Sequence, residues 1–388
     1  MVLVYPDEWH SLPDRISSFT SQNPKILVLG GKGVGKSTVI RFLMEKLKTR
    51  YDSICRLEAD CGQPDHTPPG VLSLSLRESV SSRVKLVSQR FLGFVNPSTD
   101  PFLYVKVVSQ LYDDYRRGFC NSPLFVNMHG WSTGTGIETW AAVLLTIQPD
   151  FVVYLGDDEN EFEITSRNSF ISADLPVPSS EWIRLSGIIT IDEVANLPNR
   201  SQEIAGDQRW KKFASHFRPD LAFKDEYKSC HPSEFFRYPF VRLITLNISD
   251  THISFPGNCG EVIPIDPLRA VVSRIVGLSN SESSQLICLG FVVAFDLTTI
   301  SIVIPPNISE TYGQAINSIV RGEMNWSPRD RVCHNGRVTS TDFLPIGGDP
   351  SGLPYFLPHS LKDEGSGAAK ASSRTNLRRK RLIRPPRN

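Results

Sequence analysis

A glycine-rich segment near the start of the chain constrains its fold more than any other feature. A short apolar run, Lys25–Leu29, leads directly into Gly30-Gly-Lys-Gly-Val-Gly-Lys-Ser37, and a helix-forming run reaches Lys48. The spacing Gly-x-x-x-x-Gly-Lys-Ser is that of a P-loop, and a P-loop requires a strand before it and a helix after it. A plain glycine-rich turn could share part of this pattern. Four glycines, Lys-Ser and both flanks together predict a nucleoside triphosphate site.

The residues of this loop have distinct expected roles. Backbone N–H groups of a glycine-rich turn can converge on a phosphate, and the following helix adds its unpaired N-terminal donors. We expect Lys36 to reach the β- and γ-phosphates and the Ser37 hydroxyl to bind Mg²⁺. The expected nucleotide-binding residues are Gly30, Gly31, Lys32, Gly33, Val34, Gly35, Lys36, Ser37 and Thr38.

Apolar strands alternate with helical segments up to about residue 220. The expected strands are Lys25–Leu29, Ile54–Glu58, Leu124–Asn127 and Phe151–Leu155. The expected helices are Ser37–Lys48, Pro101–Arg117, Gly136–Ile147 and Gly206–Phe217. This alternation predicts an α/β fold in which helices cover both faces of a parallel sheet. Phosphate ligands of such sheets lie at the carboxyl ends of the strands.

After about residue 230 the pattern becomes one of strands. Three β-like runs begin at Phe240, Leu286 and Ser301 and predict a smaller β-rich domain. We therefore expect a short N-terminal extension at 1–24 and a P-loop domain at 25–232. The β-rich domain would occupy 233–360, followed by a flexible linker and basic tail at 361–388.

A second motif follows the strand that ends at Glu58. It reads Glu58-Ala-Asp-Cys-Gly-Gln-Pro-Asp-His-Thr-Pro-Pro-Gly70. A carboxylate at this strand end would lie near the γ-phosphate and metal, where a kinase needs a base for the attacking hydroxyl. Asp60 is the expected base and metal ligand, with Glu58 one strand alternation away. Gln63 could orient the nucleophile or a metal-bound water, although Gly-Gln-Pro is also a common structural turn.

A third motif follows the strand Leu124–Asn127 and reads Met128-His-Gly-Trp-Ser-Thr-Gly-Thr-Gly136. Gly130 would let the backbone approach a ligand closely, and Trp131 offers a flat face for a base or ribose. Taken alone, such a tryptophan is more often part of a core. His129 could act in catalysis, although a single histidine at a strand end more often makes a structural hydrogen bond.

Charge is distributed unevenly along the chain. Residues 374–388 contain seven basic and no acidic residues, which leaves 35 basic against 41 acidic residues in the rest. A basic tail after a flexible linker suggests contact with RNA, a nuclear or nucleolar address, or an acidic partner; a solvated end without a role is the alternative.

Seven cysteines without a Cys-x-x-Cys pair favour reduced thiols. No run of 18 apolar residues occurs, so we expect no contact with a membrane.

The three motifs, in this order and followed by Ile147-Gln-Pro149, resemble the polynucleotide 5′-hydroxyl kinases. The similarity is greatest to the nucleolar branch that acts in pre-ribosomal RNA processing, rather than to the branch of the mRNA cleavage factor. It continues through Gly206–Phe217, Leu286–Phe291, Ile319–Gly322 and the basic tail.

This resemblance implies an ATP- and Mg²⁺-dependent kinase that phosphorylates the 5′-hydroxyl end of RNA or DNA during processing of the ITS2 spacer in ribosome biogenesis. Lys36 and Ser37 then match the P-loop lysine and metal-binding hydroxyl, while Asp60 and Gln63 match the acidic motif. His129, Gly130 and Trp131 match the clasp that grips the nucleic-acid end. Arg209 matches the arginine of a lid. The resemblance also implies a nuclear and nucleolar location and an endoribonuclease partner bound through the C-terminal region.

The chain departs from the family pattern at several positions. Met128 stands where the clasp usually has threonine, and Glu58 where aspartate is common. Only 24 residues precede the first strand, so we expect the family's N-terminal domain to be missing. Because Met128 removes a hydroxyl, an ATP-binding scaffold with little or no transfer remains the alternative function. A GTPase is disfavoured because no Asn-Lys-x-Asp motif is present, and a general ATPase stays open.

Overall fold

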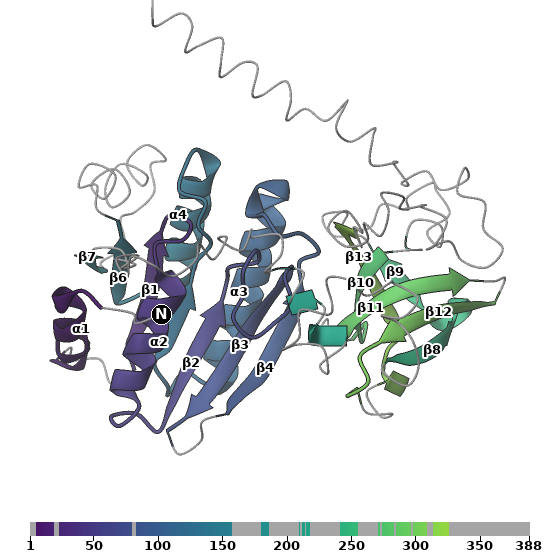
Figure 1. The fold of residues 1–388 in the computed structure, drawn as a ribbon, viewed down its shortest axis with the longest axis horizontal. Helices are drawn as coiled ribbons and strands as arrows, with labels where there is room; N and C mark the ends of the chain where they lie inside the picture. Colours follow the sequence, from purple (N-terminus) through teal and green to yellow (C-terminus); the bar gives the residue numbers. More distant parts are fainter. Residues whose placement is uncertain are drawn as a thin grey trace, which may run out of the picture.

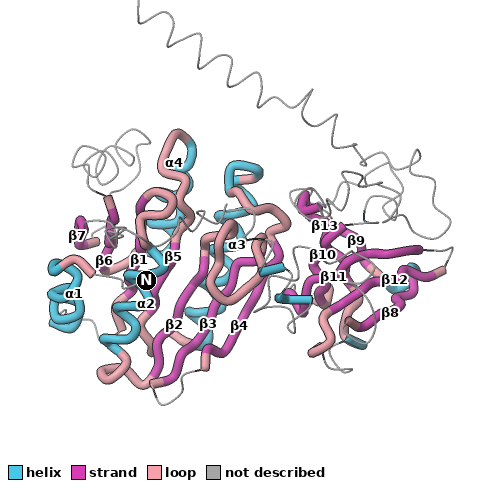
Figure 2. The backbone as a smooth tube through the Cα atoms, viewed as in Figure 1, coloured by secondary structure: helices cyan, strands magenta, loops and turns pink. Residues whose placement is uncertain are grey.

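The structure is a computed structural model. It describes residues 5–18, 23–79, 83–156, 180–185, 209, 212–213, 215–217, 241–254, 271, 274–282, 285–295, 298–308 and 313–325. These residues form two sheets (Figures 1 and 2). This arrangement agrees with the predicted α/β sheet followed by a second, β-rich part. Within the described residues, no helix is long and apolar enough to cross a membrane.

The first sheet has seven strands in the order β4-β3-β2-β5-β1-β6-β7. Its strands are β1 (Lys25–Gly30), β2 (Ser53–Glu58), β3 (Val71–Glu78), β4 (Val84–Phe91), β5 (Leu124–Asn127), β6 (Phe151–Leu155) and β7 (Glu181–Leu185). The five strands from β2 to β7 in this order run parallel, which confirms the predicted parallel sheet. Strands β3 and β4 extend it as an antiparallel hairpin that the sequence pattern did not predict.

Helices cover both faces of this sheet, as predicted. Helices α3 (Pro101–Gly118) and α4 (Thr135–Ile147) pack on one face, against side chains such as Leu27 and Leu29 of β1. Helix α2 (Lys36–Leu47) packs on the other face, against Ile26 and Val28. Successive residues of a strand point to opposite faces, so β1 is apolar at every position between these helices.

The segment before β1 contains a helix that we did not predict. Helix α1 (Asp7–Ser18) buries Trp9, Leu12 and Ile16 in the core that α2 also lines. These residues recur at helical spacing, so one face of the helix is apolar. Helix α1, within the expected N-terminal extension, therefore contributes to the packing of the P-loop sheet.

The second sheet has six strands in the order β8-β12-β11-β10-β13-β9. Its elements are β8 (Arg242–Asn247), the 3-10 turn η5 (Ile248–Asp250), β9 (His252–Ser254), β10 (Arg274–Ser279), β11 (Leu286–Phe295), β12 (Thr299–Ile304) and β13 (Ser318–Asn325). Figure 1 shows this sheet beside β4, on the side of the molecule away from α1. Buried apolar residues join the two sheets, among them Val71 and Phe91 of the first and Ile275 and Phe291 of the second.

Three predicted segments fall partly or wholly outside the described residues. Of the predicted β-rich domain at 233–360, the described residues all lie between 241 and 325. Of the expected helix Gly206–Phe217, the residues described as helical are Arg209, Lys212, Phe213 and 215–217. The linker and the basic tail at 361–388 lie outside the described part of the chain.

Candidate active site

The P-loop joins β1 to α2 at the carboxyl edge of the first sheet. Gly35 precedes α2 with φ of 102°, in the left-handed region that glycine enters without steric cost. Gly30 has φ of 137°, and a Cβ there would lie 2.5 Å from the carbonyl oxygen of Leu155. The tight turn of the loop against β6 thus requires glycine at this position. The helix that follows directs its free N–H groups at the space above the loop.

Lys36 is buried beneath this loop. Its Nζ donates to the carbonyl oxygens of Gly30, at 2.9 Å, and Gly31, at 2.6 Å. Burial lowers the pKa of Lys36, and the nearby carboxylates of Asp60 and Glu58 act in the opposite direction. An ammonium has three N–H donors, so the two carbonyls leave one donor for an anion.

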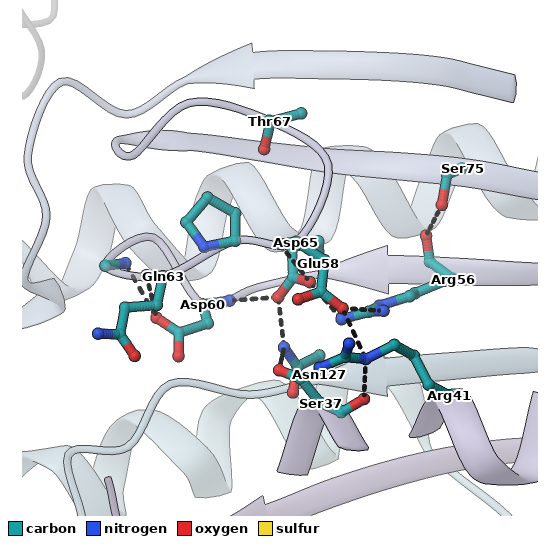
Figure 3. A network of polar contacts seen from close by, with 12 residues as sticks. Ser37, Arg41, Arg56, Glu58, Asp60, Gln63, Asp65, Thr67, Ser75 and Asn127 are labelled. Carbon is teal, nitrogen blue, oxygen red and sulfur yellow. Dashed lines mark hydrogen bonds and ion pairs between the residues drawn. The ribbon is translucent and has the colours of Figure 1, made fainter. Parts of the chain in front are cut away.

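A buried amide connects the P-loop to the acidic motif. Asn127, the last residue of β5, donates from Nδ2 to the hydroxyl of Ser37, at 3.1 Å, and to Oε1 of Glu58, at 2.6 Å. Figure 3 shows Asn127 between these two side chains. Because β5 lies between β1 and β2, a side chain at its carboxyl end can reach both the start of α2 and the end of β2.

Glu58 is itself held in a buried charge network. Its Oε2 accepts from Arg56, at 2.6 Å, and the same guanidinium donates to Oδ2 of Asp65, also at 2.6 Å. Burial raises the pKa of Glu58 to about 7, against the opposing effect of Arg56. The Asp65 pKa is lowered: burial acts to raise it, but the positive charges of Arg56, Arg41 and Lys212 outweigh that effect.

Asp60 and Gln63 lie in the turn that follows β2 (Figure 3). Oδ1 of Asp60 accepts from the backbone N–H groups of Gly62, at 2.9 Å, and Gln63, at 3.0 Å. The turn occupies one carboxylate oxygen, so the second can serve a ligand. Asp60 is half-buried, which is compatible with its predicted role as base, and that role stays a prediction.

The clasp motif packs directly on the P-loop. A Cβ at Gly130 would lie 2.8 Å from Cα and 2.9 Å from the backbone nitrogen of Lys32. The indole of Trp131 packs over Gly136, where a Cβ would lie 2.7 Å from the ring. Trp131 is half-buried, so part of its ring can meet a ligand.

His129 is buried, and its contacts indicate a structural role and not a catalytic one. Its Nδ1 accepts from the backbone N–H of Trp131, at 3.2 Å. Burial lowers the pKa of His129 to about 3, and the charge of Lys36 adds to this effect. The ring is therefore neutral at physiological pH, and it shapes the turn that presents Trp131.

Met128 points away from the clasp. Its side chain is fully buried in the core beneath α3 and α4, and its sulfur lies 4.0 Å from the hydroxyl of Tyr104. The side chain at this position therefore contacts the core in the described arrangement, rather than the place where a substrate would lie.

The predicted lid segment lies close to the acidic motif. Lys212 donates from Nζ to the carbonyl oxygen of Pro64, in the turn after Asp60. Arg209 lies near enough to Cys61 for its charge to influence that thiol. His216 accepts from the backbone N–H of Leu289 in β11, at 3.3 Å. This segment thus contacts both the active-site turn and the second sheet.

The oxygen donors of the site suit a hard cation. Within the described residues, no group of three or more His, Cys, Asp or Glu side chains could hold a metal ion. Mg²⁺ commonly keeps several waters and binds one or two carboxylates together with phosphate oxygens of a substrate. The Ser37 hydroxyl with Glu58 or Asp60 fits a magnesium ion that arrives with a nucleotide.

Several residues of this site were not recognised from the sequence. Asn127, Arg56, Tyr104 and Lys212 all contact the predicted motifs. Asn127 could have been found, because it is the polar end of an otherwise apolar strand between the P-loop strand and the acidic strand. Tyr104 and Lys212 act through contacts between distant segments, which no local pattern shows. Arg56 contacts carboxylates two and nine residues away, but its place inside an apolar strand gave no sign of that role.

Comparisons with known proteins agree with this geometry. Residues 30–217 match the family model of the mRNA cleavage and polyadenylation factor CLP1 P-loop. Polynucleotide 5′-hydroxyl-kinase NOL9 of Arabidopsis thaliana is 36% identical over 163 residues, 38% of this chain and 44% of the relative. Polynucleotide 5′-hydroxyl-kinase GRC3 of Gibberella zeae is 29% identical over 206 residues, 46% of this chain and 28% of the relative. The matches thus span less than half of these relatives.

Solved structures support the fold. A structure of the wild-type Clp1p–Pcf11p complex has a TM-score of 0.57 at 14% identity and covers 82% of this chain and 78% of its own. A second Clp1p–Pcf11p structure has a TM-score of 0.59 at 11% identity and covers 84% and 81%. Through its P-loop region, the chain is therefore similar to the polynucleotide 5′-hydroxyl kinases named GRC3 and NOL9 and to the P-loop family model of CLP1.

Proposed function

We propose that the protein is an ATP-dependent polynucleotide 5′-hydroxyl kinase, which transfers the γ-phosphate of ATP to the 5′-hydroxyl end of RNA or DNA. One observation carries the proposal: Asn127 ties the P-loop hydroxyl of Ser37 to Glu58 of the acidic motif. The clasp glycine, Gly130, lies against the same loop. Phosphate-binding, acidic and substrate-gripping motifs therefore meet at one edge of the sheet, and the related kinases carry this activity in their names.

Each residue of the site has a separate role in the proposed transfer. The 5′-hydroxyl oxygen forms a bond to the γ-phosphorus while the bond to the leaving oxygen of ADP breaks, and Asp60 accepts the hydroxyl proton. Lys36 and Arg209 offset charge on the phosphate oxygens, and Gln63 orients the attacking hydroxyl. Mg²⁺, held by Ser37 and a carboxylate of Glu58 or Asp60, would supply further positive charge at the phosphates.

The direct test is incubation with γ-labelled ATP and 5′-hydroxyl RNA, DNA and duplex oligonucleotides. The proposal expects label at the 5′ end of at least one oligonucleotide and none on a matched 5′-phosphorylated one. Hydrolysis of ATP without a labelled oligonucleotide would favour a general ATPase. Binding of ATP with neither result would favour the scaffold function.

The scaffold alternative rested on Met128. The Met128 side chain is buried and contacts Tyr104. A threonine hydroxyl in the same orientation would therefore face the core, and its loss does not remove a group from the surface where a substrate would bind. This placement favours transfer over a purely structural use of ATP.

The cellular setting is part of the same proposal. The protein would act in the nucleus and nucleolus, in pre-rRNA processing at ITS2, beside an endoribonuclease that creates 5′-hydroxyl ends. The basic residues of 374–388 are the expected contact with that partner. A chain truncated before Arg374 should bind ATP normally and lose the nuclease in pull-downs, and the full-length interaction should weaken with salt. If the truncated chain still pulls down the nuclease, residues 374–388 are not the contact with that partner.

A further inference from the structure

Helix α3 carries three buried tyrosines whose hydroxyls each donate to a backbone carbonyl of another segment. Tyr112 donates to Ile147 at the end of α4, at 3.0 Å, and Tyr115 donates to Ser122 before β5, at 2.8 Å. Tyr104 donates to Ala59, at 2.9 Å. Two of these bonds hold segments remote from the candidate active site. The third holds the residue between Glu58 and Asp60.

The contact with Ala59 fixes the backbone of the acidic motif. The N–H of Ala59 donates to the carbonyl oxygen of Asn127, at 2.9 Å, so both of its backbone polar groups have partners. The carbonyl held by Tyr104 belongs to the same peptide unit as the nitrogen of Asp60. A rotation of this peptide unit would redirect the Asp60 carboxylate, and the Tyr104 hydroxyl opposes that rotation.

The same tyrosine also contacts the clasp. Its ring packs edge-on against the imidazole of His129, with the centroids 5.1 Å apart and the planes at 75°. Tyr104 is fully buried, so water is not available to replace these contacts. One side chain from α3 therefore touches the segments that follow β2 and β5.

We propose that Tyr104 is a positioning residue that fixes the acidic motif and the clasp relative to each other, so that Asp60 and Trp131 face the same substrate end. This inference rests on the proposed kinase function. Tyr104 does not itself touch the reacting atoms; it acts through Ala59 and His129. A small displacement of either segment would slow transfer, because phosphoryl transfer depends on alignment of the nucleophile and its base.

The experiment compares Tyr104→Phe with Tyr115→Phe. Each variant loses one hydroxyl that donates to one carbonyl from the same helix, so their melting temperatures should fall by similar amounts. For Tyr104→Phe, kcat for oligonucleotide phosphorylation should fall about ten-fold or more, while the Kd for ATP stays unchanged. For Tyr115→Phe, kcat should stay within about two-fold of the unsubstituted protein. Equal kcat values for the two variants would overturn the proposal.

Amide hydrogen exchange provides a second readout that does not need activity. The N–H groups of Gly62 and Gln63 donate to Asp60, and that of Trp131 donates to His129. Because Phe keeps the ring that contacts His129, the Trp131 amide should keep its protection in both variants. The Gly62 and Gln63 amides should exchange faster in Tyr104→Phe and keep their protection in Tyr115→Phe. If the unsubstituted protein transfers no phosphate, the kinase proposal fails. If the Gly62 and Gln63 amides keep their protection in Tyr104→Phe, the positioning role fails instead.

Discussion

Two carboxylates lie at the carboxyl end of strand β2, Glu58 as its last residue and Asp60 in the turn after it, and their surroundings differ. Glu58 is buried against Arg56 and receives a hydrogen bond from Asn127. Asp60 is half-buried and uses one oxygen to shape the next turn. A base must exchange a proton with a substrate, which a half-buried group can do more readily than a buried one in an ion pair. At the scale of single residues, the geometry favours Asp60 as the base and Glu58 as the organiser of Ser37.

The first prediction concerns Asp60. Asn at this position keeps the oxygen that caps the turn and removes the carboxylate, so the fold should be retained. We expect Asp60→Asn to lower kcat by about 10²–10⁴-fold with little change in the Kd for ATP. Steady-state transfer assays and ATP titration measure the two quantities. An unchanged kcat would mean that another group accepts the proton.

The second prediction concerns Glu58 and pH. Its pKa is about 7 in the folded protein, against an ordinary value of 4.5. Between these pH values the folded state holds a proton that the unfolded chain has released, so this group stabilises the fold at low pH and loses that contribution as pH rises toward 7. The unfolding free energy of the protein, relative to that of Glu58→Gln, should fall by roughly 1–3 kcal/mol from pH 5 to pH 7.5. Urea unfolding at both pH values measures it, and a difference independent of pH would contradict the buried-carboxyl account.

At the scale of elements, the site is made where loops contact one another. The segment after β5 lies on the P-loop through Gly130, and the segment after β2 is joined to the P-loop through Asn127. The clasp and the phosphate-binding loop are therefore expected to respond to each other's displacement.

The third prediction follows from the contact of Gly130 with Lys32. Gly130→Ala places a methyl group 2.8 Å from a backbone atom of the P-loop, which a side-chain rotation cannot relieve. We expect weaker ATP binding, with the Kd raised about ten-fold, because a displacement of the loop misplaces its N–H donors. Gly118→Ala, at the end of α3 with open space around the new methyl group, is the matched control. Equal ATP affinity in both variants would show that the two loops are not coupled.

The local sequence pattern was sufficient to predict the strands and helices that flank the motifs. Strands β1, β2, β5 and β6 and helices α2, α3 and α4 were predicted to within about two residues, because each is an apolar run or period bounded by glycine, proline or a cap. Strands β10 and β13 were not predicted, and each contains a glycine. Gly277 of β10 lies under Phe91, where a Cβ would be 2.6 Å from the ring. The reason for that glycine is a contact with the other sheet, which a single strand's sequence cannot show.

At the scale of the whole molecule, the two sheets meet through closely packed backbone. Gly93, after β4, and Gly322, in β13, approach so closely that a Cβ at Gly322 would lie 2.4 Å from Cα of Gly93. Phe91 and Phe291 bury apolar surface at the same junction. The lid segment also contacts this second sheet through His216, so the position of the sheet bears on the position of Arg209 and Lys212.

The fourth prediction tests this junction. Gly322→Ala should lower the unfolding free energy by about 1–3 kcal/mol, because the added methyl group meets backbone that cannot move independently. Gly313→Ala, which meets nothing within 4 Å, is the control and should have little effect. Urea unfolding of the two variants checks the difference. Equal stability would mean that the sheets separate at this point without cost.

In the proposed function, the P-loop, the acidic motif and the clasp act together to phosphorylate a 5′-hydroxyl end. The most direct measurement is transfer of label from γ-labelled ATP to a 5′-hydroxyl RNA by the unsubstituted protein and by Lys36→Ala. The account predicts labelled RNA from the unsubstituted protein and a rate lower by about 10²–10³-fold or more from the variant, because the phosphates lose the buried ammonium. ATP binding by the unsubstituted protein without labelled RNA, or equal transfer by Lys36→Ala, would contradict it.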